Sequence, residues 1–230
     1  MEAHIAVLSL REDETCPVCA SLTEAGYQVH EHKSAEAVLT SLGDTEIDMI
    51  VLVADDSPET VSAAMRALTS VQVPLLVISS VQDENFVIRM LVLGADGCLC
   101  EPFGESEFLA RVEAHLRRYW EWGDAEREMQ AGGIVIDALS CAALVNGREI
   151  RLTPTEYRLL SRLAESSGEV VTNEDLCDHI WGFDRAAKPS SLRLYISHLR
   201  RKLEPDPHKP RFIRTKWGIG YYLEGEPADE

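Results

Sequence analysis

The sequence predicts two domains of different fold class, an α/β domain with a parallel sheet over residues 1–120 and an α+β domain over residues 133–226. Three observations support this prediction. A chain of 230 residues is long enough for two ordinary domains, each with its own core. The first half alternates short apolar runs with amphipathic stretches, which is typical of β-α-β units. The second half has apolar residues at helical spacing, followed by a hairpin pattern near its end.

The first half is expected to form a parallel sheet covered by helices on both faces. Parallel strands need crossover connections, and the amphipathic stretches between the apolar runs are suited to that role. The expected strands are 5–8, 49–53, 75–78 and 97–100, and the expected helices are 17–25, 59–68, 85–93 and 105–118. Residues 121–132 have no core pattern and lead into a glycine pair, so they are predicted to be a linker.

The second half begins with a strand at 134–136 and a hairpin turned at Asn146-Gly147. Thr153-Pro-Thr-Glu156 is a capping box with proline at the first helical position, and it starts the first helix. Thr172 is expected to cap a second helix that runs through Trp181. A third helix starts at Ser190, and residues 212–223 form a terminal hairpin. Three helices closed by a hairpin form a winged helix.

Charge is distributed unevenly along the chain. The net charge is -17, which argues against a uniformly cationic surface for nucleic acid. Residues 1–120 carry a net charge of -13, whereas residues 188–216 hold nine basic and two acidic residues, net +7. A local basic stripe on an acidic protein favours a phosphate-backbone partner, although a solvated helix face gives a similar pattern.

The third helix has an apolar stripe made by Leu192, Ile196, Leu199 and Leu203. Its opposite face is suited to the major groove of double-stranded DNA, because its side chains can reach phosphates and base edges. The helix N-terminus and the hairpin tip extend this surface. The candidate DNA contacts are Ser190, Ser191, Arg193, Leu194, Ser197, His198, Arg200, Arg201, Lys202, Arg214, Thr215, Lys216 and Trp217.

Several motifs together resemble OmpR/PhoB-type response regulators. Thr153-Pro-Thr-Glu-Tyr-Arg-Leu-Leu160, His179-Ile-Trp-Gly182 and Arg214-Thr-Lys-Trp-Gly-Ile-Gly-Tyr221 are similar to their winged-helix effector domain, and Leu93-Gly-Ala-Asp96 with Glu101-Pro-Phe103 to their receiver. The resemblance implies a flavodoxin-like receiver with a five-stranded parallel sheet. It also implies a bacterial transcription regulator of two-component systems that binds tandem half-sites as a homodimer. Trp181 lies in the region that can face RNA polymerase.

The sequence departs from this family in two places. An arginine commonly stands at the position of Trp217, and often at that of His198, so base specificity does not carry over. The receiver's phosphorylation site, read across without gaps, falls on Ser9, Leu10, Val53, Ser79 and Glu101. Val53 has no nucleophilic atom, Ser9 and Leu10 replace the carboxylate pair that holds Mg²⁺, and Glu101 replaces the lysine.

This degenerate site predicts regulation without phosphorylation. As a hypothesis, Arg11 pairs with Glu101 or Asp55. An alternative is a register shift in which Asp55 or Asp56 accepts the phosphoryl group and Glu12 or Asp13 binds the metal, but the cation would still be absent. The family's receiver–receiver face maps onto Val87, Met90, Leu91, Asp96, Glu107, Arg111 and Arg118. Apolar residues there either support a constitutive dimer or belong to the core.

The six cysteines do not indicate a disulfide framework, because no signal peptide or membrane span is apparent and the cytoplasm is the expected compartment. Cys16-Pro-Val-Cys19 starts a helix and could form a redox sensor, although small core cysteines are the simpler interpretation. Neither a cofactor nor a metal is expected, and the spacing of the histidines does not suggest a metal site. Three functions remain open: a DNA-binding regulator, a receiver used for protein interaction or redox sensing, and a thiol redox enzyme.

Overall fold

The structure is a computed structural model that describes residues 3–11, 16–55, 57–68, 71–123, 128–137, 140–166, 168–181 and 189–224. The chain divides into two compact units, Met1–Trp122 and Gly123–Glu230. Each unit contains its own sheet or sheets and its own buried core. Within the described residues, no helix is both long and apolar enough to cross a membrane.

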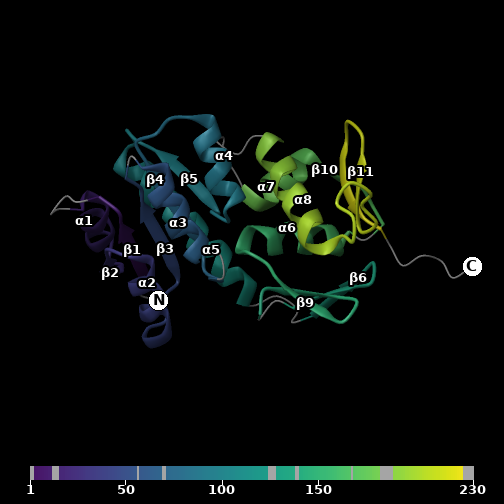
Figure 1. The fold of residues 1–230 in the computed structure, drawn as a ribbon, viewed down its shortest axis with the longest axis horizontal. Coiled ribbons are helices and arrows are strands. Elements are labelled where there is room, and N and C mark those ends of the chain that lie inside the picture. Colours follow the sequence, from purple (N-terminus) through teal and green to yellow (C-terminus); the bar gives the residue numbers. More distant parts are fainter. Residues whose placement is uncertain are drawn as a thin grey trace, which may run out of the picture. The chain divides into compact units, whose positions relative to one another are not determined.

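The first unit contains a five-stranded parallel sheet in the order β2-β1-β3-β4-β5 (Figure 1). The parallel register places the ends of neighbouring strands at one edge, with Ser9 beside Val53, Val53 beside Ile78, and Ser79 beside Cys100. This confirms the predicted flavodoxin-like fold, whose ligand site lies at the carboxyl edge where the strand order reverses. The strands are β1 (His4–Ser9), β2 (Gln28–His32), β3 (Met49–Val53), β4 (Leu75–Ser79) and β5 (Gly97–Cys100).

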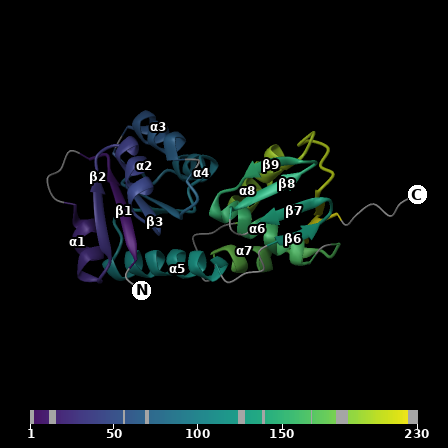
Figure 2. The same cartoon turned by 90° about the horizontal axis from the view of Figure 1, so that it is seen from below.

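Helices cover both faces of this sheet, as predicted. Figure 2 shows α1 (Pro17–Glu24) and α5 (Glu105–Gly123) on one face, and α2 (Ala35–Asp44), α3 (Pro58–Leu68) and α4 (Glu84–Val92) on the other. The core under α1 and α5 is built by alternate strand residues together with helix residues such as Leu22 and Val112, both 0% exposed. Because every second strand residue points to the same face, this spacing follows directly from strand geometry.

The second unit opens with a four-stranded antiparallel sheet of β6 (Glu128–Ala131), β7 (Ile134–Asp137), β8 (Ala142–Val145) and β9 (Arg148–Arg151). Asn146 and Gly147 both have positive φ, 51° and 78°, which is the backbone of the predicted two-residue hairpin turn. The linker prediction for residues 121–132 needs correction. Helix α5 continues to Gly123, and residues 128–131 pair with β7 through backbone hydrogen bonds, which do not require an apolar pattern.

The remaining elements form the predicted winged helix (Figure 1). The Thr153 side chain accepts from the Glu156 N–H while Glu156 accepts from the Thr153 N–H, and Thr172 accepts from the Asp175 N–H, so both expected helix caps are present. Gly220 passes so close to the backbone of Val171 that a Cβ there would lie 1.9 Å from the Val171 carbonyl oxygen. The elements are α6 (Pro154–Glu165), α7 (Asn173–Trp181), α8 (Pro189–Leu203), and a sheet of β10 (Val171–Thr172), β12 (Gly220–Leu223) and β11 (Ile213–Lys216).

Candidate nucleic-acid interface and the carboxyl edge of the parallel sheet

Helix α8 separates its side chains into a buried and an open face. Leu192, Ile196, Leu199 and Leu203 are at most 4% exposed, as their spacing predicts, and Tyr195 joins them in the core. Arg193, Ser197 and Arg201 are exposed on the other side. The helix therefore presents two guanidinium groups and a hydroxyl to solvent, a combination that can bind phosphates and base edges.

A groove of about 550 Å³ lies between α8 and the hairpin of β11 and β12, the wing. It brings together residues from both elements that the sequence predicted as DNA contacts. No aspartate or glutamate lines it among the residues that the structure describes. At the wing tip, the Trp217 side chain is 90% exposed, so a core role for this residue is excluded. The predicted contacts in the groove are Arg193, Ser197, Arg200, Arg201, Thr215, Lys216 and Trp217.

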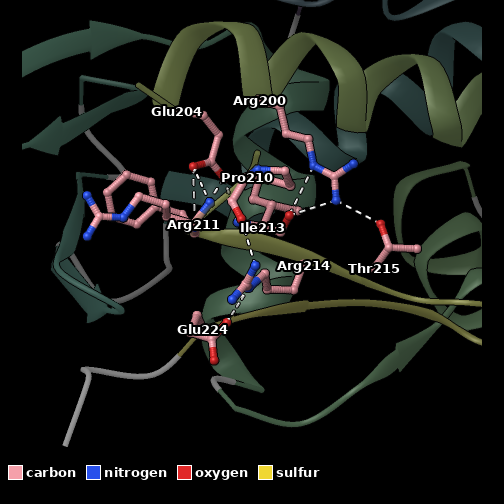
Figure 3. A network of polar contacts seen from close by, with 9 residues as sticks. Arg200, Glu204, Pro210, Arg211, Ile213, Arg214, Thr215 and Glu224 are labelled. Atoms are coloured by element: carbon pink, nitrogen blue, oxygen red, sulfur yellow. Dashed lines mark hydrogen bonds and ion pairs between the residues drawn. The ribbon is translucent and has the colours of Figure 1, made fainter. Parts of the chain in front are cut away.

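Arg200 on α8 and Glu204, the residue directly after this helix, hold the wing in place (Figure 3). The Arg200 guanidinium donates to the Ile213 carbonyl oxygen at 2.7 and 3.0 Å and to the Thr215 hydroxyl at 2.8 Å. The Glu204 carboxylate, which is buried, accepts from the backbone N–H groups of Phe212 and Ile213 at 2.9 Å. It also accepts from the Arg211 N–H at 2.6 Å. These bonds fix the first wing strand relative to the third helix.

Two other predicted DNA contacts, Arg214 and Lys202, form ion pairs with carboxylates of the same chain. Arg214 pairs with Glu224 at 2.5 Å and donates to the Pro210 carbonyl oxygen (Figure 3). Lys202 pairs with Glu156 at 2.5 Å. Their charges are therefore partly neutralised, whereas Arg193, Arg201 and Lys216 are exposed.

His198 does not face solvent as predicted. Its side chain is 9% exposed, and its Nε2 atom is buried without a hydrogen-bond partner among the described residues. Burial, and then the charge of Arg201, lower its pKa below the ordinary value. The ring lies at the border of the apolar stripe next to Leu199, which explains why a helical projection alone assigned it to the open face. Of the other candidates, Ser191 and Leu194 are half-buried, and the Ser190 side chain lies outside the described residues.

At the carboxyl edge of the parallel sheet, the structure brings the degenerate-site residues to adjacent strand ends. Val53 is 4% exposed, Ser9 is 8% exposed, and Ser79 is buried with its hydroxyl accepting from the Val81 N–H at 3.0 Å. Glu101 follows β5, and its N–H donates to the Ser79 carbonyl oxygen. Leu10 comes directly after β1, and its N–H donates to the Val53 carbonyl oxygen at 3.0 Å.

Arg11 and Glu101 form a two-bond ion pair across this edge. Arg11 Nη1 and Nη2 donate to Glu101 Oε1 and Oε2 at 3.0 and 2.6 Å, and Arg11 Nε donates to the Ala54 carbonyl oxygen at 2.9 Å. One of the two expected pairings of Arg11 is thus present. Asp55 instead accepts from the Ser57 N–H. Asp56, Glu12 and Asp13, which the register-shift alternative requires, lie outside the described residues.

Comparisons with known proteins agree on one family. Residues 147–223 match the family model described as "Transcriptional regulatory protein, C terminal". The chain is 32% identical over 208 residues to the transcriptional regulatory protein KdpE of Mycobacterium tuberculosis, covering 89% of this chain and 91% of that protein. It is 30% identical over 211 residues to the regulatory protein VanR of Enterococcus faecium, covering 88% and 90%. The chain belongs to the OmpR/PhoB-type response regulators.

This assignment makes the chain a DNA-binding transcription regulator with a receiver followed by a winged-helix effector domain. A solved structure of a RitR mutant has the same fold, with a TM-score of 0.81 and 21% identity, covering 97% of this chain and 99% of that one. The first unit is hereafter called the receiver and the second the effector domain.

The receiver's edge does not fit the Mg²⁺ ion that phosphorylatable receivers use. Mg²⁺ takes oxygen ligands in octahedral geometry and is usually held by carboxylates. Ser9 and Leu10 replace the carboxylate pair, and the Arg11 guanidinium is bonded at the same edge. Within the described part of the chain, no group of three His, Cys, Asp or Glu side chains could hold a metal ion.

The expected dimer contacts of this response regulator are only partly at the surface. Met90 and Leu91 are buried in the receiver, so the core alternative is correct for them. Asp96 is 2% exposed and accepts from the Leu75 N–H at 2.9 Å, which corrects its assignment to the exposed receiver–receiver face. Glu107 pairs with Arg111 on α5, and Val87 is half-buried, whereas the Arg118 side chain lies outside the described residues.

Two further predictions are changed by the structure of this regulator. Trp181, the expected polymerase contact, is 6% exposed, and its ring packs 5.6 Å from that of Tyr195, so it is a core residue. In the Cys16-Pro-Val-Cys19 segment, burial and then a hydrogen bond between the Cys19 and Cys16 thiols raise the pKa of Cys19 well above its ordinary value. Burial raises the pKa of Cys98 to about 12. Since the thiolate is the reactive form, these environments disfavour thiol chemistry at Cys19 and Cys98.

Proposed function

We propose that this protein binds specific double-stranded DNA sites as a homodimer on tandem half-sites, without phosphorylation of its receiver. The groove between α8 and the wing carries this proposal. It combines exposed Arg193, Arg201 and Lys216 with a fixed wing on a chain whose net charge is -17. Such a local concentration of cations, free of carboxylates among the described lining residues, is suited to a phosphate backbone.

In the proposed complex, α8 lies in the major groove with Arg193, Ser197 and Arg201 directed at base edges and phosphates. Arginine can donate two parallel hydrogen bonds to guanine, while Ser197 can bond to either kind of base edge. The wing places Lys216 and Trp217 against the neighbouring backbone or minor groove. Arg200 and Glu204 do not contact DNA in this arrangement but position the wing relative to the helix.

Independence from phosphorylation is supported by the receiver edge. The aliphatic side chain of Val53 offers no atom on which a phosphoryl group could be placed. Glu101 would repel an incoming phosphate, and Arg11, the cation beside it, is already bonded to its carboxylate. The dimer would therefore have to be stable in the unmodified protein or depend on another input.

The homodimer is proposed from the resemblance of the receiver to its family rather than from an exposed apolar patch. Val87, Glu107 and Arg111 remain at the surface of the proposed face. With Trp181 in the core, RNA polymerase contact is not assigned to that residue. No catalytic role is proposed, and the cytoplasm remains the expected compartment.

Salt dependence of DNA binding tests this function. Duplexes with a randomised core would be selected on the untreated protein, and the affinity for the enriched sequence measured by fluorescence anisotropy at several salt concentrations. Affinity should fall steeply with salt, and Arg193→Ala and Arg201→Ala should each lower the slope of log K against log salt by about 1 per protomer, or about 2 for the dimer. Arg66→Ala, which removes one exposed charge from α3 of the receiver, is the matched control and should leave the slope unchanged. Selection of no sequence, or a slope insensitive to both groove variants, would contradict the proposal.

A further inference from the structure

A cavity of about 620 Å³ lies at the carboxyl edge of the receiver sheet. It is bounded by the ends of β1 and β3 and by the first residues of α1 and α5, including Ser9, Val53, Val18 and Phe108. In open sheets of this topology, the crevice beyond the strand ends is the usual place of a ligand. The volume is also in the range of small-molecule pockets.

Most of the inner wall of this cavity is apolar. Val18, Val53 and Phe108 are 7%, 4% and 1% exposed, so they present carbon surface to the cavity while being held by the core. The rings of Phe103 and Phe108 lie 5.9 Å apart and form an aromatic wall. Rigid apolar walls of this kind favour the apolar body of an organic molecule over a hydrated ion.

One polar side chain of the inner wall is available to a ligand. The Ser9 side chain is 8% exposed and lines the cavity. Its hydroxyl can donate or accept a hydrogen bond, so it offers one polar contact to a molecule in the cavity.

The described charged residues of the lining do not favour an anion as the ligand. Arg11 could attract one, but its guanidinium is bonded to both oxygens of Glu101 and to the Ala54 carbonyl oxygen. The pair is neutral as a whole, and the remaining charged residue of the described lining, Glu105, is an exposed carboxylate at the rim. The described inner wall therefore carries no unbalanced charge.

We propose that this cavity binds a small, uncharged, amphipathic organic molecule. Its apolar body lies against Val18, Val53 and Phe108, and its polar group hydrogen-bonds to the Ser9 hydroxyl. The proposal goes beyond DNA binding and holds whether or not the effector domain binds the sites proposed above.

Two dyes that share one ring skeleton test the charge and the shape of this site. N-Phenyl-1-naphthylamine is uncharged and carries a single N–H group, and 8-anilino-1-naphthalenesulfonate adds a sulfonate to the same rings. Both fluoresce more strongly in apolar surroundings. Titrated into the full-length protein, the uncharged dye should bind at one saturable site, with an affinity at least about tenfold higher than the sulfonate. Equal or tighter binding of the sulfonate would overturn the proposal.

Variants of cavity-lining residues test whether the dye binds in this cavity. Val53→Phe and Ser21→Trp add bulk to the inner wall and the rim, and each should weaken binding of the uncharged dye by at least about tenfold. Leu39→Trp is the matched control, because Leu39 lines a different hollow of about 580 Å³ in the same receiver and should leave the affinity unchanged. Unchanged binding in either filled variant, with thermal unfolding showing a folded receiver, would overturn the proposal.

Ser9→Ala and Glu101→Gln complete the test with smaller changes. Ser9→Ala removes the cavity-lining hydroxyl and should weaken the uncharged dye by about fivefold. If Val53→Phe and Ser21→Trp both fail to fold, Ser9→Ala still tests the proposal. An unchanged affinity of Ser9→Ala for the uncharged dye would contradict it. Glu101→Gln removes the negative charge that neutralises Arg11, so it should strengthen sulfonate binding by about tenfold. No change in sulfonate binding would refute the charge assignment.

Discussion

The ion pair of Arg11 and Glu101 shows how single residues define the receiver edge. Arg11 directly follows the two positions where phosphorylatable receivers carry their acidic pair, and Glu101 stands where they carry a lysine. The two side chains are 28% and 31% exposed, so the pair is only partly screened by water. Two parallel hydrogen bonds fix its geometry, as arginine and a carboxylate are able to do.

Arg11→Ala is expected to destabilise the receiver by about 1 kcal/mol. The variant leaves the Glu101 carboxylate half-buried without its partner and also removes a donor to the Ala54 carbonyl oxygen. Urea denaturation followed by circular dichroism measures the change. The charge-swapped double variant Arg11→Glu with Glu101→Arg should recover part of the loss, and an unchanged midpoint for Arg11→Ala would refute the role of the pair.

His198 is expected to make the effector domain less stable in acid. Burial, followed by the Arg201 charge, lowers the pKa of the folded imidazole below the ordinary value of about 6.5. At pH values between the folded and the unfolded pKa of His198, the unfolded chain binds more protons than the folded one. The effector domain therefore has its full stability above pH ~6.5 and loses part of it as the pH falls below that value. His198→Gln should therefore reduce the difference between unfolding midpoints at pH ~7.5 and ~5.5. The control is His208→Gln at an exposed position, and an equal effect of both variants would contradict the prediction.

Residue-level prediction from the sequence succeeded where a role depends on spacing along one element. The four leucine and isoleucine positions of α8 are all buried, as their helical period requires. Predictions failed where a role depends on a partner distant in the chain. Asp96 is bonded to Leu75 across the sheet, Trp181 packs on Tyr195, and neither partner can be read from local pattern.

At the scale of elements, the connection between α8 and the wing decides the geometry of the interface. Arg200 and Glu204 lie one helical turn apart, so both side chains reach the same wing strand. The strand thereby gains hydrogen-bond partners on the side that does not pair with β12. The sequence showed both residues within a basic stretch but not that they hold the wing.

Glu204→Ala is expected to loosen the start of β11. Three backbone N–H groups, of Arg211, Phe212 and Ile213, lose their acceptor, so the effector domain should lose about 2 to 4 kcal/mol of stability. Amide hydrogen exchange of Phe212 and Ile213 should accelerate in parallel. Glu224→Ala removes an exposed carboxylate from the same wing, and its cost should be about 0.5 kcal/mol or less. Similar costs for the two variants would argue against a role of Glu204 in positioning.

Elements marked by caps, turns or apolar runs were predictable, and unmarked ones were not. The Thr153 capping box and the Asn146-Gly147 turn appear where the sequence placed them. β2 was not predicted individually, because it is an edge strand with only one neighbour in its sheet and its residues are exposed or half-buried. β6 was assigned to the linker for a related reason, since its pairing with β7 depends on main-chain groups.

At the scale of the whole molecule, the chain combines an acidic receiver with an effector domain whose cations are concentrated in one groove. The net charge of -13 over residues 1–120 opposes attachment of the receiver to DNA. Any specific binding is therefore expected from the groove, where no aspartate or glutamate stands among the described lining residues. This division of charge agrees with the proposed function and was visible in the sequence.

Restoring one aspartate is not expected to restore phosphorylation. Val53→Asp, treated with acetyl phosphate and Mg²⁺, should show no added phosphoryl mass by intact mass spectrometry, because the carboxylate pair and the lysine are still absent. A carboxylate at this buried position should also destabilise the receiver. The combined variant Ser9→Asp, Leu10→Asp, Val53→Asp and Glu101→Lys is the matched comparison and should regain the modification. Phosphorylation of the unaltered chain would refute independence from it.

The pairing across the receiver edge has a consequence for how such a protein can diverge from its relatives. A lysine at position 101 would set two like charges against each other in the place where Arg11 Nη2 and Glu101 Oε2 lie 2.6 Å apart. Arginine at 11 and glutamate at 101 are therefore expected to be gained and lost together in descent. Among related sequences, arginine at 11 and glutamate at 101 should therefore occur together in one lineage. This pattern is expected to be distinct from the distribution of sequences that lack the acceptor aspartate.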